Sequence, residues 1–178
     1  MGFITQERRG SSRTSGRIGF DLTPLDPSTG KVAIDEAVML ARLSSNSTVA
    51  GGRPLPTVGR YDVYVDNVDT TAVAILNEMH KQSAGTSASG TAPKVVGIVD
   101  EIGKMECFSK AFCMSMEELL LKQELVPIVA TIALKGGGFV AKAKEFPSVE
   151  VIEVTRENRD SLPDALATKV AAMLASHQ

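Results

Sequence analysis

The order of apolar and polar positions along the 178-residue chain separates predicted strands from predicted helices. Near the start, GFITQE and GRIGFDLTPL are typical of two strands, with a Ser- and Gly-rich segment between them. The stretch VGRYDVYVD alternates cleanly and predicts a further strand. The stretch DEAVMLARL is ambiguous, because its spacing favours a helix while its neighbours form a long irregular segment.

From residue 57 onward, predicted strands and helices alternate. KVVGIVD and LVPIVATIAL are so continuously apolar that they predict strands buried on both faces, as in a parallel sheet, and VEVIEVT predicts another strand. Helical spacing marks TTAVAILNEMHKQ, the segment from 105 to 120, FVAKAKEF and the C-terminal NRDSLPDALATKVAAMLASH. The pattern predicts one α/β domain of three layers over residues 1–178, with the front third as an antiparallel appendage.

Composition and charge exclude several classes of function. Apolar residues make up 43% of the chain and the formal net charge is −2, which leaves no broad basic surface for nucleic acid. The basic stretch ERRGSSRTSGR favours a solvated loop over a binding arm. No window approaches the ~18 apolar residues of a membrane helix. The two cysteines and two histidines lack zinc-site spacing. We interpret the cysteines as free thiols in a reducing compartment and therefore expect a cytoplasmic protein.

The candidate chemistry lies at the end of KVVGIVD, where Asp100 and Glu101 follow the apolar run. Groups at the carboxyl ends of parallel strands project into a shared crevice. One carboxylate there could hold Mg²⁺, which prefers oxygen ligands, while the other orients a water for attack on a phosphate. The same short pattern also fits a surface turn with solvated carboxylates, and spacing alone does not separate the two interpretations.

Four ordered stretches resemble one family. DEIGKME followed by Phe resembles the Walker B segment of the small P-loop nucleoside-triphosphatase family that includes the cancer-related nucleoside-triphosphatase. GFITQE…GRIGFDL is similar to that family's GFYTEE…RRIGFDV hairpin, VGRYDVYVD to its VGxYxVD strand, and VTRENRDSLP to its VTxENRxxLP segment. The resemblance implies a P-loop NTPase-like three-layer sandwich with a mostly parallel sheet and an antiparallel N-terminal hairpin. It also implies hydrolysis of ATP or GTP with Mg²⁺.

The resemblance also implies roles for individual residues. Asp100 would bind Mg²⁺ and the nucleotide, and Glu101 would polarise the attacking water. Lys104 is a candidate for stabilising phosphate charge or, equally, for a salt bridge at the start of the next helix.

Three further positions carry weaker implications. Asn158 and Arg159 would lie near the nucleotide, with helix capping and a surface ion pair as the alternative. Arg17 would either reach the site or only sit on the hairpin.

The phosphate-binding loop of such enzymes has the pattern G-x-x-x-x-G-K-[ST], and it does not occur in these 178 residues. In the resembling family it precedes the GFYTEE hairpin. We therefore expect a chain that lacks the first strand-loop-helix unit, on the scale of the ~30 residues of a βαβ motif. Without that loop, the chain lacks the N–H groups, the lysine and the hydroxyl that would stabilise the negative charge of the triphosphate, so hydrolysis should be weak or absent.

Three interpretations remain open from the sequence. The first is a nucleoside triphosphatase whose start lies further upstream. The second is a non-catalytic binding or regulatory scaffold that has lost the loop, and the third is an interaction module that uses the basic front segment. The base preference, the oligomeric state and the physiological substrate are not determined by these patterns.

Overall fold

The computed structural model describes residues 1–178 apart from 12–15, 46–51, 85–94, 122–125 and 177–178. Part of the basic front segment therefore lies outside the described residues. The described strands are β1 (Gly2–Arg9), β2 (Arg17–Leu25), β3 (Val38–Leu43), β4 (Thr57–Val58), β5 (Tyr61–Val63), β6 (Gly97–Ile102) and β7 (Ile128–Ile132). The helices are α1 (Val65–Asn67), α2 (Val73–Ala84), α3 (Lys110–Leu121), α4 (Phe139–Ala143) and α5 (Leu162–Ser176). A π-helical stretch (Val68–Ala72) joins α1 to α2, and 3₁₀ turns span Ile34–Glu36 and Glu106–Phe108.

The described strands form a single mixed sheet in the order β4-β5-β3-β2-β1-β6-β7. β1 pairs in parallel with β6, and β6 in parallel with β7, whereas the pairings from β1 through β2, β3 and β5 to β4 are antiparallel. The predicted α/β fold is confirmed. Two details were wrong: the front third extends the same sheet instead of forming an appendage, and the described sheet is not mostly parallel, because four of its six strand pairings are antiparallel.

The sheet has more antiparallel pairings than expected because residues 38–43 form a strand and not the helix that their spacing favoured. Ala41 of β3 lies opposite Phe20 of β2 and also opposite Val63 of β5. Pairing on both sides supplies backbone hydrogen bonds along the strand, and this tertiary contribution outweighs the helical spacing.

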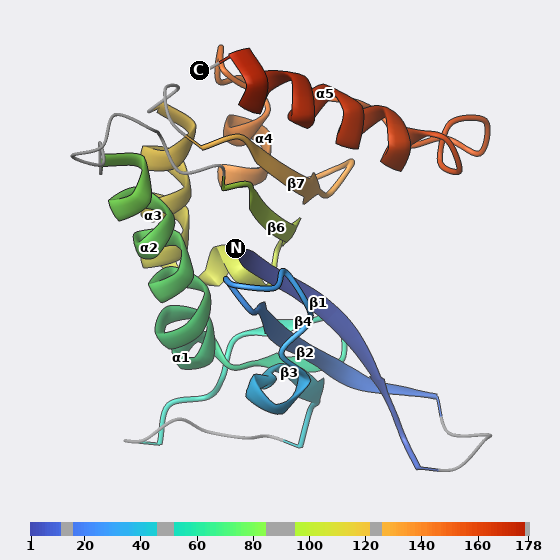
Figure 1. Cartoon of the computed structure of the whole chain (residues 1–178). Coiled ribbons are helices and arrows are strands. Elements are labelled where there is room, and N and C mark those ends of the chain that lie inside the picture. Colours follow the sequence, from blue (N-terminus) through green and yellow to red (C-terminus); the bar gives the residue numbers. More distant parts are fainter. Residues whose placement is uncertain (12–15, 46–51, 85–94, 122–125, 177–178) are drawn as a thin grey trace.

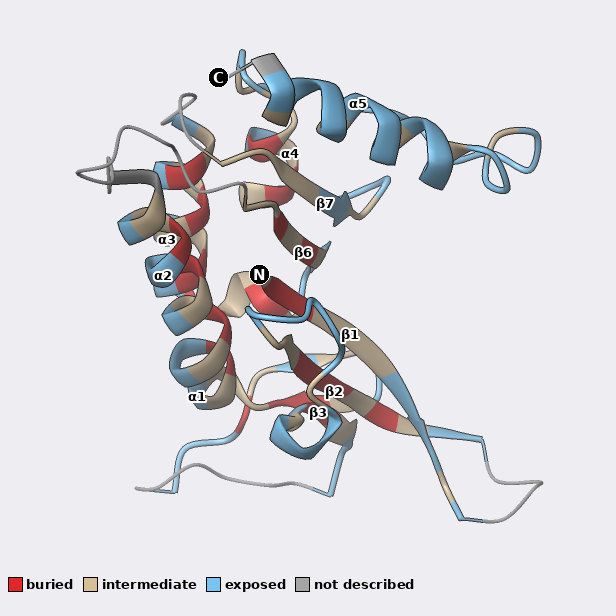
Figure 2. Ribbon diagram, in the orientation of Figure 1, coloured by how far each residue is buried: buried red, intermediate tan, exposed pale blue. Residues whose placement is uncertain are grey.

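Helices cover the two faces of the sheet unequally (Figure 1). On one face α2 and α3 pack against the sheet and close the core, in which Val99 of β6 is fully buried. The core consists of Phe3, Leu22, Leu40, Val68, Ala72, Leu76, Met79, Val99, Ile102, Phe112, Met116 and Leu119. On the other face lies α5, which has no buried residue among those described and is drawn mostly exposed in Figure 2.

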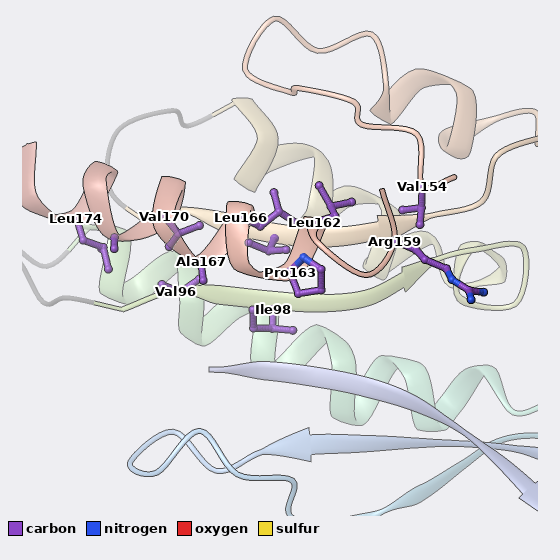
Figure 3. Close-up of a pocket in the computed structure, with 12 residues that line it drawn as sticks. Val96, Ile98, Val154, Arg159, Leu162, Pro163, Leu166, Ala167, Val170 and Leu174 are labelled. Atoms are coloured by element: carbon purple, nitrogen blue, oxygen red, sulfur yellow. The ribbon is translucent and has the colours of Figure 1, made fainter. Parts of the chain in front are cut away.

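An apolar groove of about 640 Å³ separates α5 from the β6–β7 part of the sheet (Figure 3). The helix contributes a stripe at four-residue spacing, and the sheet contributes Val96, Ile98 and Val129. The members of the helical stripe are Leu162, Leu166, Val170 and Leu174. The apolar face of α5 is thus directed at the sheet but only partly covered.

The segment VEVIEVT was predicted as a strand, and this was wrong for the described structure. Its last six residues, 150–155, have no strand pairing, and Val151, Ile152 and Val154 are exposed. β7 is the last strand of the described sheet on this side. A sequence of good strand formers needs a neighbouring strand to supply its backbone hydrogen bonds, and none is paired with it here.

Candidate active site

The two acidic residues lie together at the carboxyl end of β6, where the sheet pairing is irregular. The register between β6 and β7 shifts between Val99 and Ile102, so Asp100 and Glu101 occupy a bulge. Glu101 has a φ of 85° and is the one residue other than glycine with a positive φ in the described part of the chain. Bulges redirect side chains, and strained backbone of this kind clusters at functional sites.

Asp100 is held from both neighbouring strands. Its Oδ1 accepts a hydrogen bond of 2.9 Å from the hydroxyl of Thr131 on β7, and its Oδ2 accepts one of 3.2 Å from the backbone N–H of Thr5 on β1. The hydroxyl of Thr5 also donates to the Asp100 carbonyl at 2.9 Å. The carboxylate is therefore fixed in the middle of the parallel part of the sheet, and its remaining lone pairs are available to a ligand.

Glu101 is an exposed residue whose carboxyl nevertheless lies against the turn that follows it. An added Cβ on Gly103 would lie 2.6 Å from Glu101 Oε1, which places the carboxyl beside that glycine. Burial, together with the neighbouring charge of Asp100, raises the pKa of Glu101. A carboxylate with a raised pKa is a better general base at neutral pH than a fully solvated one.

Lys104 lies on the same turn and is exposed. No ion pair or hydrogen bond of its side chain occurs within the described residues, so the predicted salt bridge is not formed there. The position is compatible with a cation that meets an incoming phosphate.

The VTRENRDSLP segment forms a turn before α5. Oδ1 of Asn158 accepts a hydrogen bond of 2.8 Å from the Thr155 N–H, and Nδ2 donates at 2.8 Å to the carbonyl of Glu153. Arg159 forms an exposed ion pair of 3.3 Å with Asp160, and Figure 3 shows its guanidinium at the end of the apolar groove. Both side chains therefore make local contacts: Asn158 bonds the backbone of the turn before α5, and Arg159 forms a surface ion pair.

Arg17 lies on the β1–β2 hairpin, where its Nε donates to Glu7 at 2.6 Å and its guanidinium stacks 5.1 Å from the centre of the Phe20 ring. Hydrogen bonding to Arg17 is the main cause of the lowered pKa of Glu7. Arg17 pairs in register with Arg9, four positions beyond Thr5 along β1. The structure therefore does not bring Arg17 to the two acidic residues.

The sequence interpretation missed two residues of this site, Thr5 and Thr131. A single threonine in an apolar strand is an ordinary strand residue, so neither carried a signal by itself. Their function as partners of Asp100 arises from the side-by-side packing of β1, β6 and β7, which are far apart in the chain.

Comparison with known proteins shows the family of the chain. The sequence pattern of a family described as NTPase matches residues 1–167. The chain belongs to this NTPase family. It is 36% identical over 171 residues to a mouse (Mus musculus) protein named cancer-related nucleoside-triphosphatase homolog, a match covering 93% of this chain and 78% of the relative. It is 32% identical over 173 residues to the nucleoside-triphosphatase THEP1 of Natranaerobius thermophilus, covering 97% of this chain and 82% of that protein.

A solved structure has the same fold. The solution structure of a human cancer-related nucleoside triphosphatase superposes with a TM-score of 0.64 at 27% identity, over 96% of this chain and 81% of that one. The family predicted from DEIGKME and the other three stretches is confirmed, and nucleoside-triphosphatase activity is the function that the names of these relatives give.

Proposed function

We propose that this NTPase-family chain hydrolyses ATP or GTP to the diphosphate and phosphate, with Asp100 and Glu101 as its central residues. The observation that carries the proposal is their placement together on the bulge that ends β6. Asp100 is anchored by Thr5 and Thr131, whereas Glu101 points to the following turn. One carboxylate is thus rigid and the other borders open solvent.

Magnesium fits Asp100 as a donor. Within the described residues there is no cluster of three or more His, Cys, Asp or Glu that could hold a metal ion. Mg²⁺ is commonly bound by one or two carboxylates and completed by water and substrate phosphates, and Asp100 offers one such carboxylate. When bound, the ion would neutralise negative charge on the phosphates. Thr5 and Thr131 hold the carboxylate of Asp100 in place and would keep it oriented for the ion.

Glu101 is proposed to accept a proton from, or orient, the attacking water. Its raised pKa and its position at the exposed edge of the turn support this role. Lys104, exposed on the same turn, is proposed to approach the phosphate charge. Asn158 and Arg159 are kept as weaker candidates for nucleotide contact, because both already make local contacts.

The pattern G-x-x-x-x-G-K-[ST] does not occur in these 178 residues. Fast turnover would therefore require a phosphate-binding loop from another segment. We therefore propose that the 178-residue chain alone is weakly active or inactive. The single-domain unit that it forms would then depend on an added strand-loop-helix segment.

A cytoplasmic location agrees with the free thiols of Cys107 and Cys113. No described helix is long and apolar enough to cross a bilayer.

The test compares two proteins for turnover of ATP and GTP with Mg²⁺. One is the 178-residue chain, and the other is a loop-bearing chimaera in which a strand, a G-x-x-x-x-G-K-[ST] loop and a helix are fused before Met1. The Met1 nitrogen donates to the Val96 carbonyl at 2.9 Å, a bond that a peptide N–H of the fusion can also make. We expect turnover only, or far more strongly, in the chimaera.

Glu101→Gln in the chimaera is the inactive control. If the unextended chain hydrolyses nucleotide at the chimaera's rate, the dependence on the loop is wrong. If neither protein hydrolyses nucleotide while both fold, the non-catalytic scaffold is the better explanation.

A further inference from the structure

The two cysteines of the chain lie in contact with each other, and neither has a part in the proposed hydrolysis. Cys107 is the middle residue of the 3₁₀ turn Glu106–Phe108, and Cys113 lies in the first turn of α3. The Cys113 thiol donates a hydrogen bond to the backbone carbonyl of Cys107, with 3.8 Å between the sulfur and the oxygen. The sulfur of the second cysteine therefore rests against the first.

The backbone holds both cysteines in place. The N–H of Cys107 donates to the Gly103 carbonyl at 3.1 Å, and the N–H of Cys113 donates to the Ser109 carbonyl at 3.2 Å. Ser109 is buried between them and caps α3, because its hydroxyl accepts a hydrogen bond of 2.9 Å from the N–H of Phe112. Thiols that a fixed backbone keeps in contact react with each other at a high effective concentration.

The surroundings of the two thiols also suit disulfide exchange. Both cysteines are only partly buried, so a small reagent in solvent can reach them. Hydrogen bonding between the two thiols is the main cause that raises the pKa of Cys107 and lowers the pKa of Cys113. The thiolate is the attacking species in disulfide exchange, and Cys113 is therefore the thiol that reacts first.

We propose that Cys107 and Cys113 form a reversible disulfide, which makes the junction between the 3₁₀ turn and α3 a redox modification site. The oxidant is a small disulfide of the glutathione type. Disulfides inside cells are usually transient and catalytic or redox-sensing, and a pair of partly exposed thiols in contact suits such a bond. The proposal does not depend on nucleotide hydrolysis.

The reaction takes place in two exchange steps. The Cys113 thiolate attacks one sulfur of glutathione disulfide, which forms a mixed disulfide and releases one glutathione thiolate. The Cys107 thiol then loses its proton to solvent and attacks the Cys113 sulfur, which forms the protein disulfide and releases the second glutathione thiolate. Both released thiolates take up a proton. The two cysteines together lose two electrons, and the glutathione disulfide gains them.

The test equilibrates the 178-residue chain in mixtures of reduced and oxidised glutathione, blocks the remaining thiols with an alkylating reagent and digests the chain with trypsin. Cleavage after Lys104, Lys110 and Lys122 places the cysteines in separate peptides, MECFSK and AFCMSMEELLLK. We expect mass spectrometry to find these peptides joined, with the loss of two hydrogen atoms, and separated again by a reductant. Non-reducing gel electrophoresis should show that the bond lies within one chain.

The same titration in urea measures what the fold contributes. At a fixed concentration of reduced glutathione, the folded chain should be half-oxidised at more than about tenfold less oxidised glutathione than the unfolded chain. By the thermodynamic cycle, the equilibrium constant for unfolding of the oxidised chain should be lower by the same factor, and tenfold corresponds to about 1.4 kcal/mol. Urea unfolding of the reduced and oxidised chains measures this factor independently.

Two variants test the order of attack. Cys107→Ser keeps a hydroxyl donor beside Cys113 and should accumulate the mixed disulfide, whereas Cys113→Ser should react with glutathione disulfide at least about tenfold more slowly. Equal rates for the two variants would contradict this order. The proposal is wrong if the folded chain forms only mixed disulfides or covalent dimers, or links its cysteines no more readily than the unfolded chain. These outcomes are measured on the original chain, so they decide even where a variant does not fold.

Discussion

The hydroxyl of Thr131 donates a hydrogen bond of 2.9 Å to Oδ1 of Asp100, and this bond joins the edge strand β7 to the proposed magnesium ligand. Partners that orient a metal ligand commonly change metal affinity or activity by about 10- to 100-fold when they are removed. The bond is exposed to solvent, so its effect on stability should be small by comparison.

We therefore expect Thr131→Val in the loop-bearing chimaera to require about tenfold more Mg²⁺ for half-maximal turnover. Valine has a similar shape and a high preference for strands. The free energy of unfolding of the variant should therefore lie within about 1 kcal/mol of that of the original chain. Thr131→Ser, which retains a hydroxyl, is the matched control. A Mg²⁺ titration of turnover measures the effect, and an identical titration curve for Thr131→Val would show that the contact is not functional.

Glu101 combines a strained backbone with the proposed catalytic carboxylate, and two substitutions separate these properties. Glu101→Gly relieves the φ of 85° and should raise the free energy of unfolding by about 1 kcal/mol. Glu101→Gln keeps the strain and should not stabilise the chain. Both should lower kcat of the chimaera by about 10²- to 10⁴-fold, the range for removal of a general base. Urea unfolding and steady-state kinetics measure the two effects, and a Glu101→Gly variant that is no more stable would count against backbone strain.

The pKa of Glu106 gives a sign for the pH dependence of stability. In the folded chain it is raised from 4.5 to about 8, mainly by burial. Between these values the unfolded chain loses the proton and the folded chain keeps it, so stability should fall as pH rises through this window. The full change would reach several kcal/mol, at about 1.4 kcal/mol for each pKa unit. Denaturant unfolding at a series of pH values measures it.

Glu106→Gln is the control for this pH dependence, because glutamine does not titrate. The variant should lose most of the decline in stability between pH 4.5 and 8. Glu101 also has a raised pKa and contributes in the same direction, so the difference between the two proteins, and not the slope of either, reports on Glu106. Parallel curves for the two proteins would mean that Glu106 is ionised in the folded chain.

The sequence pointed to the two acids that are proposed as central, but not to the residues that hold them. Asp100 and Glu101 follow a buried run, so their place at the end of a strand could be predicted from local pattern. The contacts of Asp100 with Thr5 and Thr131 depend on which strands lie next to β6, and that is a property of the whole sheet. The bulge and the positive φ at Glu101 also lack a local signal, because glutamate rarely adopts this conformation.

The errors in the fold have the same origin. Residues 38–43 have helical spacing and form β3, because β2 and β5 pair with it on both sides. Residues 150–155 have strand-like composition and form no strand, because they pair with none. In each case non-local pairing decides between two states that local propensity leaves close in free energy.

Asn158 offers a test between capping and nucleotide contact. Its side chain bonds the backbone on both sides of the turn, at Thr155 and Glu153. Asn158→Ala should therefore lower the free energy of unfolding by about 1–2 kcal/mol. Arg159→Ala, which removes an exposed ion pair with the adjacent Asp160 and a side chain at the end of the groove, should change it by less than about 0.5 kcal/mol. Urea unfolding measures both, and an unchanged stability for Asn158→Ala with weakened nucleotide binding would favour the nucleotide role.

Within the described residues no strand pairs with the outer edge of β7, and this edge and the apolar groove together predict self-association. Val154, which lines the groove, is 65% exposed, and Val151 of the same segment is 52% exposed. Exposed apolar patches and unpaired strand edges promote association between chains. Val154→Lys should lower the apparent mass in light scattering at high protein concentration. Added salt should reduce this effect of the substitution only slightly. Met114→Lys is the matched control: Met114 is 64% exposed on α3, and the change adds the same charge away from the groove. Equal effects of the two substitutions would assign any association to net charge instead of to the groove.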